Sequence, residues 1–144
     1  MKLRTILLAF ALTCWSASAH LVLVANSQPR ADIVVAADVV AALPNVSLDN
    51  ADPSERVDKI AWAAHDLQVY IEKISGAKLP IVSDDEADSG QHILVGRSKL
   101  TAAYDDKIPS GLTNLREEEG YAILTDANTL VLAGLGLVLV AGGA

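Results

Sequence analysis

The sequence predicts a small acidic α/β domain, and three features predict it: one long amphipathic helix, two apolar runs of strand length, and a hairpin near the C-terminus. The runs at 33–36 and 92–96 contain almost only apolar residues. Short runs of this kind are typical of strands that are buried on both faces. We therefore expect a core built from both strands and helix.

The clearest element is a helix predicted over residues 53–75. Asp52 is a suitable N-cap, Pro53 fits the first helical position, and Glu55 completes a capping-box pattern. Gly76 supplies a left-handed C-terminal cap. Apolar side chains recur at helical spacing and predict one buried face: Val57, Ile60, Ala61, Ala64, Leu67, Ile71 and Ile74. The polar side chains fall mostly outside this face: Glu55, Arg56, Asp58, Lys59, Asp66, Gln68, Glu72 and Lys73.

A β-hairpin is predicted from segments 120–125 and 129–133, which are separated by Asp126-Ala127-Asn128. Within the first strand, Tyr121 and Ile123 would point to the same face, because side chains alternate along a strand. The hairpin thus supplies the last two predicted strands.

The remaining elements are shorter. Residues 79–83 are predicted as a strand, and 98–104 as one or two helical turns. Residues 38–50 are predicted to be irregular, because Pro44 and Asn45 favour turns.

Residues 1–19 have the pattern of a secretory signal peptide. Two basic residues precede an apolar run at 6–12, and Ala17-Ser18-Ala19 is a small-x-small cleavage site that places the mature start near His20. The run is shorter than the roughly 20 residues that span a bilayer. We therefore expect a secreted or periplasmic protein with no membrane association after cleavage.

Removing the leader changes the composition of the chain. Cys14, the only cysteine, is lost, so the mature chain can form no disulfide and no thiolate metal site. Without Lys2 and Arg4 the 11 basic residues fall to nine against 18 acidic ones, a formal net charge of −9. Nucleic-acid binding is not expected of such a surface, because phosphates require clustered Lys and Arg.

The three histidines do not predict a catalytic or metal site. No G-x-S-x-G or H-E-x-x-H motif is present, and no two histidines have ligand spacing. His20 stands at the mature terminus. We expect His65 to pack its ring at the boundary of the helix, and His92 to lie at a solvated strand edge.

Two acidic clusters, 84–86 and 117–119, resemble pairs of glycosidase carboxylates only in composition. Adjacent charges in polar loops predict a solvated surface. Gly134-Leu135-Gly136 lacks the third glycine of a phosphate loop. We predict no catalytic residue, no cofactor and no metal ligand. The aromatic residues that could form a sugar platform are Trp62, Tyr70, Tyr104 and Tyr121.

Three segments, taken in order, resemble a known domain: 67–82 with its Ser75-Gly-Ala, 93–98 reading I-L-V-G-R-S, and 119–134 with its Gly-Tyr-Ala-Ile hairpin. This order is similar to the N-terminal domain of secreted α-glucuronidases and to the second domain of bacterial chitobiases and β-hexosaminidases. The resemblance implies an α/β sandwich, a mixed β-sheet with a long helix packed on one face. It also implies an accessory role, because the catalytic carboxylates of such enzymes lie on a following TIM barrel.

The expected organisation is a signal peptide at 1–19, a linker at 20–32, an α-glucuronidase N-terminal-like accessory domain at 33–134, and an apolar tail at 135–144. The tail contains no polar side chain, and we expect it either to pair as a last strand or to mark a truncated product.

The function expected from the resemblance is that of a non-catalytic fragment of a secreted glycoside hydrolase that degrades polysaccharides such as xylan-like glycans. Its partners would be a catalytic TIM-barrel domain or a polysaccharide. The alternative is a stand-alone secreted module that binds a glycan or a protein, with the apolar tail docking as a strand. An independent hydrolase that uses the acidic loops ranks last.

Overall fold

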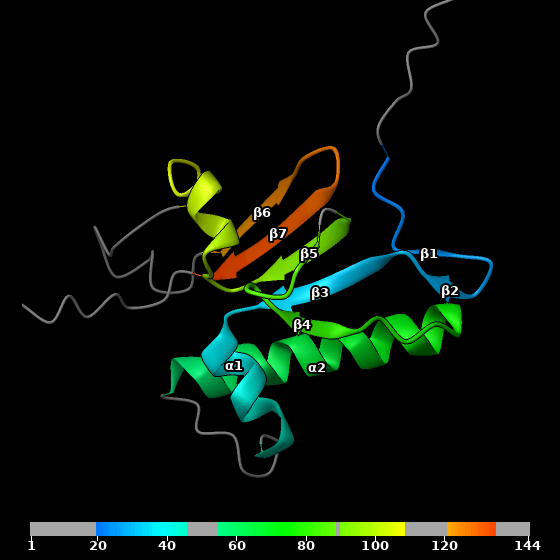
Figure 1. The fold of residues 1–144 in the computed structure, drawn as a ribbon, viewed down its shortest axis with the longest axis horizontal. Helices are drawn as coiled ribbons and strands as arrows, with labels where there is room; N and C mark the ends of the chain where they lie inside the picture. The colour runs from blue at the N-terminus through cyan, green and yellow to red at the C-terminus, as the bar shows by residue number, and fades with distance from the viewer. Residues whose placement is uncertain (1–19, 46–54, 89, 109–120, 135–144) are drawn as a thin grey trace, which may run out of the picture.

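The protein has a five-stranded mixed sheet with two helices packed on one face (Figure 1). The structure is a computed structural model that describes residues 20–45, 55–88, 90–108 and 121–134. The strand order is β4-β3-β5-β7-β6. Strands β4, β3, β5 and β7 run parallel to one another, and β6 is antiparallel to β7. The predicted fold class, a mixed sheet with a long helix on one face, is confirmed.

The centre of the sheet is formed by β3 (Ala31–Val35) and β5 (Gln91–Val95). Both predicted apolar runs form these strands, and residues 33 to 35 are completely buried. Strand β4 (Ile81–Ser83) pairs with the other side of β3. A β-branched run that meets side chains on both faces gains burial on both, which explains why these residues form the middle of the sheet.

Helix α2 (Arg56–Ser75) crosses the face formed by β4, β3 and β5. Its C-cap, Gly76, has a φ of 72°, as the left-handed cap predicts. The predicted start at Pro53 with Asp52 as cap is wrong, because the N-cap is Glu55 in an extended conformation and the helix begins at Arg56. Asp52 and Pro53 themselves lie outside the described residues. Two side chains differ from the predicted stripe: Ile74 is 84% exposed, and Gln68 is buried. The Nε2 atom of Gln68 donates a 2.6 Å hydrogen bond to the carbonyl of Leu79, so this amide joins the helix to the segment before β4.

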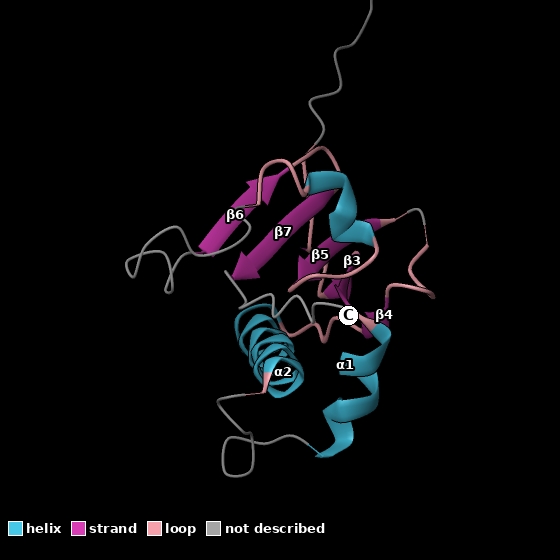
Figure 2. Ribbon diagram, turned by 90° about the vertical axis from the view of Figure 1, so that its left-hand side faces the viewer, coloured by secondary structure: helices cyan, strands magenta, loops and turns pink. Residues whose placement is uncertain are grey.

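The prediction that residues 38–50 are irregular was wrong for their first part. Helix α1 (Ala37–Ala42) and a 3-10 helix (Leu43–Asn45) occupy it. Val39 of α1 is fully buried against the same core as α2. Burial of this side chain outweighs the turn preference of the residues that follow, and the helix ends before the proline. Figure 2 shows α1 and α2 on the same side of the sheet.

Residues 20–32, predicted as a linker, include a small hairpin of β1 (Val24–Ala25) and β2 (Gln28–Pro29). Its turn residues Asn26 and Ser27 both have positive φ, at 54° and 56°. The structured chain therefore begins before position 33, since the backbone N–H of Val22 also donates to Gln91 Oε1 at 2.6 Å.

The C-terminal hairpin is formed by β6 (Tyr121–Thr125) and β7 (Thr129–Gly134), close to its predicted bounds. Two hydrophobic clusters lie on opposite faces of the sheet. One packs Ile33 and Ile93 against the helices, and the other packs Val34 and Leu94 against Ile108, which follows a 3-10 helix at Leu100–Tyr104. In the part of the chain that the structure describes, no helix combines the length and the apolar character needed to cross a bilayer.

Candidate functional site

The carboxyl edge of the parallel strands is the first candidate site, because ligands of open α/β sheets bind there. Two polar segments meet at this edge. Asp84 follows β4, and its backbone N–H donates to the carbonyl of Val35 at the end of β3 at 2.9 Å. The loop that begins at Gly96 follows β5. The edge therefore joins residues from three neighbouring strands.

Asp84 is buried, at 9% exposed, whereas Asp85 and Glu86 are exposed. The prediction of a fully solvated acidic cluster is wrong for Asp84 and confirmed for the other two. Asp84 Oδ2 accepts the backbone N–H of Lys99 at 2.8 Å, which anchors the loop after β5. Asp84 Oδ1 is buried and has no hydrogen-bond partner within the described ranges. The second cluster, 117–119, lies outside the described residues.

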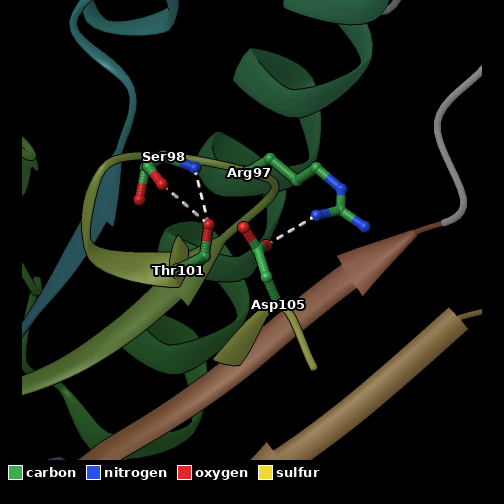
Figure 3. Close-up of polar contacts among 4 residues, drawn as sticks. All are labelled: Arg97, Ser98, Thr101 and Asp105. Carbon is green, nitrogen blue, oxygen red and sulfur yellow. Dashed lines mark hydrogen bonds and ion pairs between the residues drawn. The ribbon is translucent and has the colours of Figure 1, made fainter. Parts of the chain in front are cut away.

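The loop after β5 is closed by its own side chains (Figure 3). Thr101 Oγ1 accepts the backbone N–H of Ser98 at 2.8 Å and donates to the carbonyl of Ser98 at 2.9 Å. Arg97 forms an ion pair with Asp105 at 2.8 Å. The Oγ of Ser98 is buried and lacks a partner among the described residues. These contacts satisfy backbone groups of a tight turn and hold the 3-10 helix in place.

Lys99 extends from this loop and pairs with Asp85 on the surface. The hydrogen bond and the negative charge of Asp85 raise the pKa of Lys99 above 10.5, with a smaller electrostatic contribution from Asp84. Because the amine is exposed, water and salt screen this pair. The hydrogen bonds and ion pairs at the carboxyl edge hold the loop in place, and among the described residues they do not form a nucleophile–base pair.

Gly96 explains how closely the helix approaches this edge. Its φ is 75°, a left-handed conformation that favours glycine, and a Cβ at this position would lie 2.6 Å from Cδ1 of Ile60 on α2. Its backbone N–H donates to the carbonyl of Leu132 on β7 at 2.9 Å. Gly96 therefore allows α2 to pack closely on the sheet, and its backbone N–H also links the end of β5 to β7.

The second candidate is an apolar groove of about 410 Å³ beside this glycine. It lies between α2 and the β6–β7 hairpin, on the helix side of the sheet. Tyr121 and Ile123 form its outer wall and are 76% and 59% exposed. Lys59 is the charged residue of its lining. The other lining side chains and glycines are Ile60, Ala63, Leu67, Val95, Gly96, Ala122, Leu132, Ala133 and Gly134.

The groove exists because β6 lies beyond the reach of the helices. An α-helix is roughly 10 Å wide and neighbouring strands are about 4.8 Å apart, so one helix covers about two strands. Helix α2 packs on β3, β4 and β5. The predicted shared face of Tyr121 and Ile123 therefore points toward the helix layer and yet remains open. Sequence patterning predicted this shared face, but it did not predict the exposure.

The aromatic residues do not all meet at this groove. Only Tyr121 of the four lines it. Tyr70 is 55% exposed on α2, where the ammonium of Lys73 lies 5.3 Å from its ring. The hydroxyl of Tyr104 lies 3.4 Å from Asp126 Oδ2, at the hairpin turn. A sugar platform made of several stacked rings is therefore not formed by these residues in the described structure.

The histidines differ from the expectations. His65 is exposed on α2 and does not bury its ring. His92 is buried at 7% exposed, although a solvated strand edge was predicted. Its Nε2 atom lies 3.0 Å from the backbone carbonyl oxygen of Asp88. The strand order accounts for this burial, since β5 is a central strand and His92 lies between its register partners Asp32 on β3 and Thr129 on β7.

Comparison of the chain with models of protein families, with curated proteins and with solved structures gave no match.

Proposed function

We propose that the chain is a non-catalytic N-terminal accessory domain of a secreted glycoside hydrolase of the α-glucuronidase or β-hexosaminidase type. The ordered resemblance of segments 67–82, 93–98 and 119–134 motivates the proposal. The fold class supports it, since the resemblance implied a mixed sheet with a long helix on one face. The observation that carries it furthest is the open apolar groove beside β6.

The groove has the chemistry of a protein contact. Its lining is almost entirely aliphatic, and Tyr121 and Ile123 provide large exposed apolar side chains at its rim. Sugars require several polar partners for their hydroxyls, whereas the centre of a protein interface is depleted of charge and enriched in aromatic residues. We infer that the catalytic TIM-barrel domain packs against this groove.

The carboxyl edge supports the non-catalytic part of the proposal. Asp84 anchors the backbone of Lys99, and Thr101 closes the turn at Ser98. Each of these polar groups already serves the loop. The barrel would then degrade the polysaccharide, and this domain would hold the barrel or present the polysaccharide to it.

Two measurements test the catalytic half of the proposal. The purified chain, incubated with glucuronoxylan fragments and chito-oligosaccharides, should release neither uronic acid nor hexosamine. Release that follows the chain through purification would contradict the accessory role. The source DNA beyond codon 144 should encode a (β/α)8 barrel in some frame, and unrelated genes there would remove the main support for a hydrolase.

A binding experiment tests the groove. The barrel, expressed separately, should co-elute with the chain, and the double variant Tyr121→Ser/Ile123→Ser should abolish co-elution. Tyr70→Ser/Ile74→Ser is the matched control, because it removes the same side-chain types from exposed positions on α2 outside the groove lining. If the control variant loses the barrel as completely as the groove variant, the proposed contact surface is wrong.

A stand-alone secreted binding module is the second candidate, and the edge position of β6 favours it. Strand β6 pairs with β7 on one side and is the last strand of the sheet among the described residues. An extended peptide could add to this edge and place alternate side chains in the groove. Binding of a β-strand peptide or a glycan by a stable monomer, with no barrel encoded nearby, would favour this function.

A further inference from the structure

Three metal-binding side chains meet at the amino edge of the sheet, far along the strands from the loop that Asp84 anchors. Asp32 of β3 and His92 of β5 are partners in the parallel register. Asp88 comes just before β5. One ring nitrogen of His92 and one carboxylate oxygen of each aspartate all lie within 4.8 Å of one another. The cluster belongs to the face opposite the helices, because the next side chains on that face are Val34 and Leu94.

His92 has the orientation of a metal ligand. Its Nε2 lies 3.0 Å from the carbonyl oxygen of Asp88, so an Nε2–H would donate to that oxygen. The lone pair is then on Nδ1, which is buried and has no hydrogen-bond partner within the described part of the chain. Histidines that bind metals commonly donate their other N–H to a backbone carbonyl, which fixes the tautomer and the ring orientation. Nδ1 is therefore the ring nitrogen of His92 that is available to bind a metal ion.

We propose that Asp32, Asp88 and His92 bind a divalent transition-metal ion of the zinc class. A neutral imidazole nitrogen favours Zn²⁺ over Mg²⁺ and Ca²⁺, which prefer oxygen ligands only. Two carboxylates balance the charge of the ion. Three protein ligands leave one position of a tetrahedral zinc for water. The site would stabilise the sheet by joining β3 to the segment before β5.

The geometry requires only a small closure. Ligand atoms bound to one tetrahedral zinc at about 2.1 Å lie about 3.4 Å apart. The three atoms lie within 4.8 Å of one another, so the ligands must close by up to about 1.4 Å. Asp88 can supply it because its side chain is exposed. Its Oδ1 accepts the N–H of Gly90 at 2.6 Å, which keeps the carboxylate beside the start of β5.

Isothermal titration of Zn²⁺ into the chelator-treated chain is the test. One zinc per chain is expected, with Mg²⁺ and Ca²⁺ far weaker. Asp88→Asn changes an exposed residue and should leave folding intact while weakening zinc binding about 10-fold or more. His92→Gln should do the same, and its circular dichroism spectrum checks that it folds. Thermal unfolding should shift upward with zinc and return with a chelator.

The two other histidines provide the matched controls. His65→Gln and His20→Gln alter exposed histidines outside the cluster and should bind zinc as the unaltered chain does. Zinc affinity that survives in both Asp88→Asn and His92→Gln would overturn the proposal. So would the absence of saturable binding to the unaltered chain, or a loss of binding in either control.

Discussion

The two halves of the sheet differ in what covers them, although both contain apolar strands. Ile93 on β5 is completely buried under α2, whereas Ile123 on β6 faces the same side and is 59% exposed. Both are isoleucines in the middle of five-residue strands. The difference shows that alternating apolar residues predict which side chains share one face of a strand. They do not predict whether another element covers that face. One half is buried under the helices, and the other leaves large apolar side chains exposed.

The largest effect is expected in the covered half. Leu79 is fully buried in the helix-side cluster. Leu79→Ala should lower the free energy of unfolding by about 2–5 kcal/mol, because it removes buried methyl groups and leaves a cavity. Urea unfolding followed by circular dichroism measures the loss. A change below about 1 kcal/mol would mean that this half is not the stabilising core.

Alanine substitutions at Gly96 and Gly76 test how closely α2 packs on the sheet at the boundary between its two halves. Gly96→Ala should cost about 2–4 kcal/mol, because it adds a clash with Ile60 to the penalty of a positive φ. Gly76→Ala has a similar φ of 72° and nothing within 4 Å of the added Cβ, so it should cost only about 1 kcal/mol. Equal losses in thermal unfolding would show that α2 does not approach the sheet as closely as described.

The variant Gln68→Ala tests the hydrogen bond that joins α2 to the segment before β4. Gln68→Ala leaves the carbonyl of Leu79 buried without this donor and should cost about 1–3 kcal/mol. The exposed Glu72→Ala on the same helix is the control and should change stability by less than about 0.5 kcal/mol. Comparable losses in the two variants would show that the Gln68 bond contributes nothing specific.

The smallest effect is expected at Lys99. Its pKa is raised by Asp85, so its contribution is present at neutral pH and is lost only as the pH rises through the raised pKa. Because the pair is exposed and screened at about 0.15 M salt, Lys99→Met should change the unfolding temperature only slightly, and by the same amount at pH 6 and at pH 9. A large drop in the unfolding temperature of this variant at pH 7 would contradict the surface character of the pair.

The sequence predicted the elements whose signals are local. The helix over Arg56–Ser75, the buried strands and the hairpin all follow from periodicity, turn residues and the Gly76 cap. Helix α1 was missed because its stability comes from packing Val39 into the core rather than from capping or length. Ile74 was predicted to be buried, but the helix extends past the sheet there and the side chain is exposed.

The candidate sites depend on contacts that sequence patterns do not carry. The pairing of Asp32 with His92 joins residues 60 positions apart, and only the strand register reveals it. The sequence places Asp84 in a run of charged loop residues. In the structure it is buried, and its carboxylate accepts the backbone N–H of Lys99, which anchors the loop after β5. The groove arises from the position of α2 relative to β6, which depends on how many strands one helix can cover.

The covered half of the sheet holds the domain together, whereas the apolar face of β6 is exposed. The most direct measurement compares the free energies of unfolding of Ile93→Ala and Ile123→Ala in the same purified chain. Ile93→Ala should lose about 2–5 kcal/mol and Ile123→Ala less than about 1 kcal/mol. Equal losses would contradict the account, because Ile123 would then be buried within the chain itself and the groove would not be available.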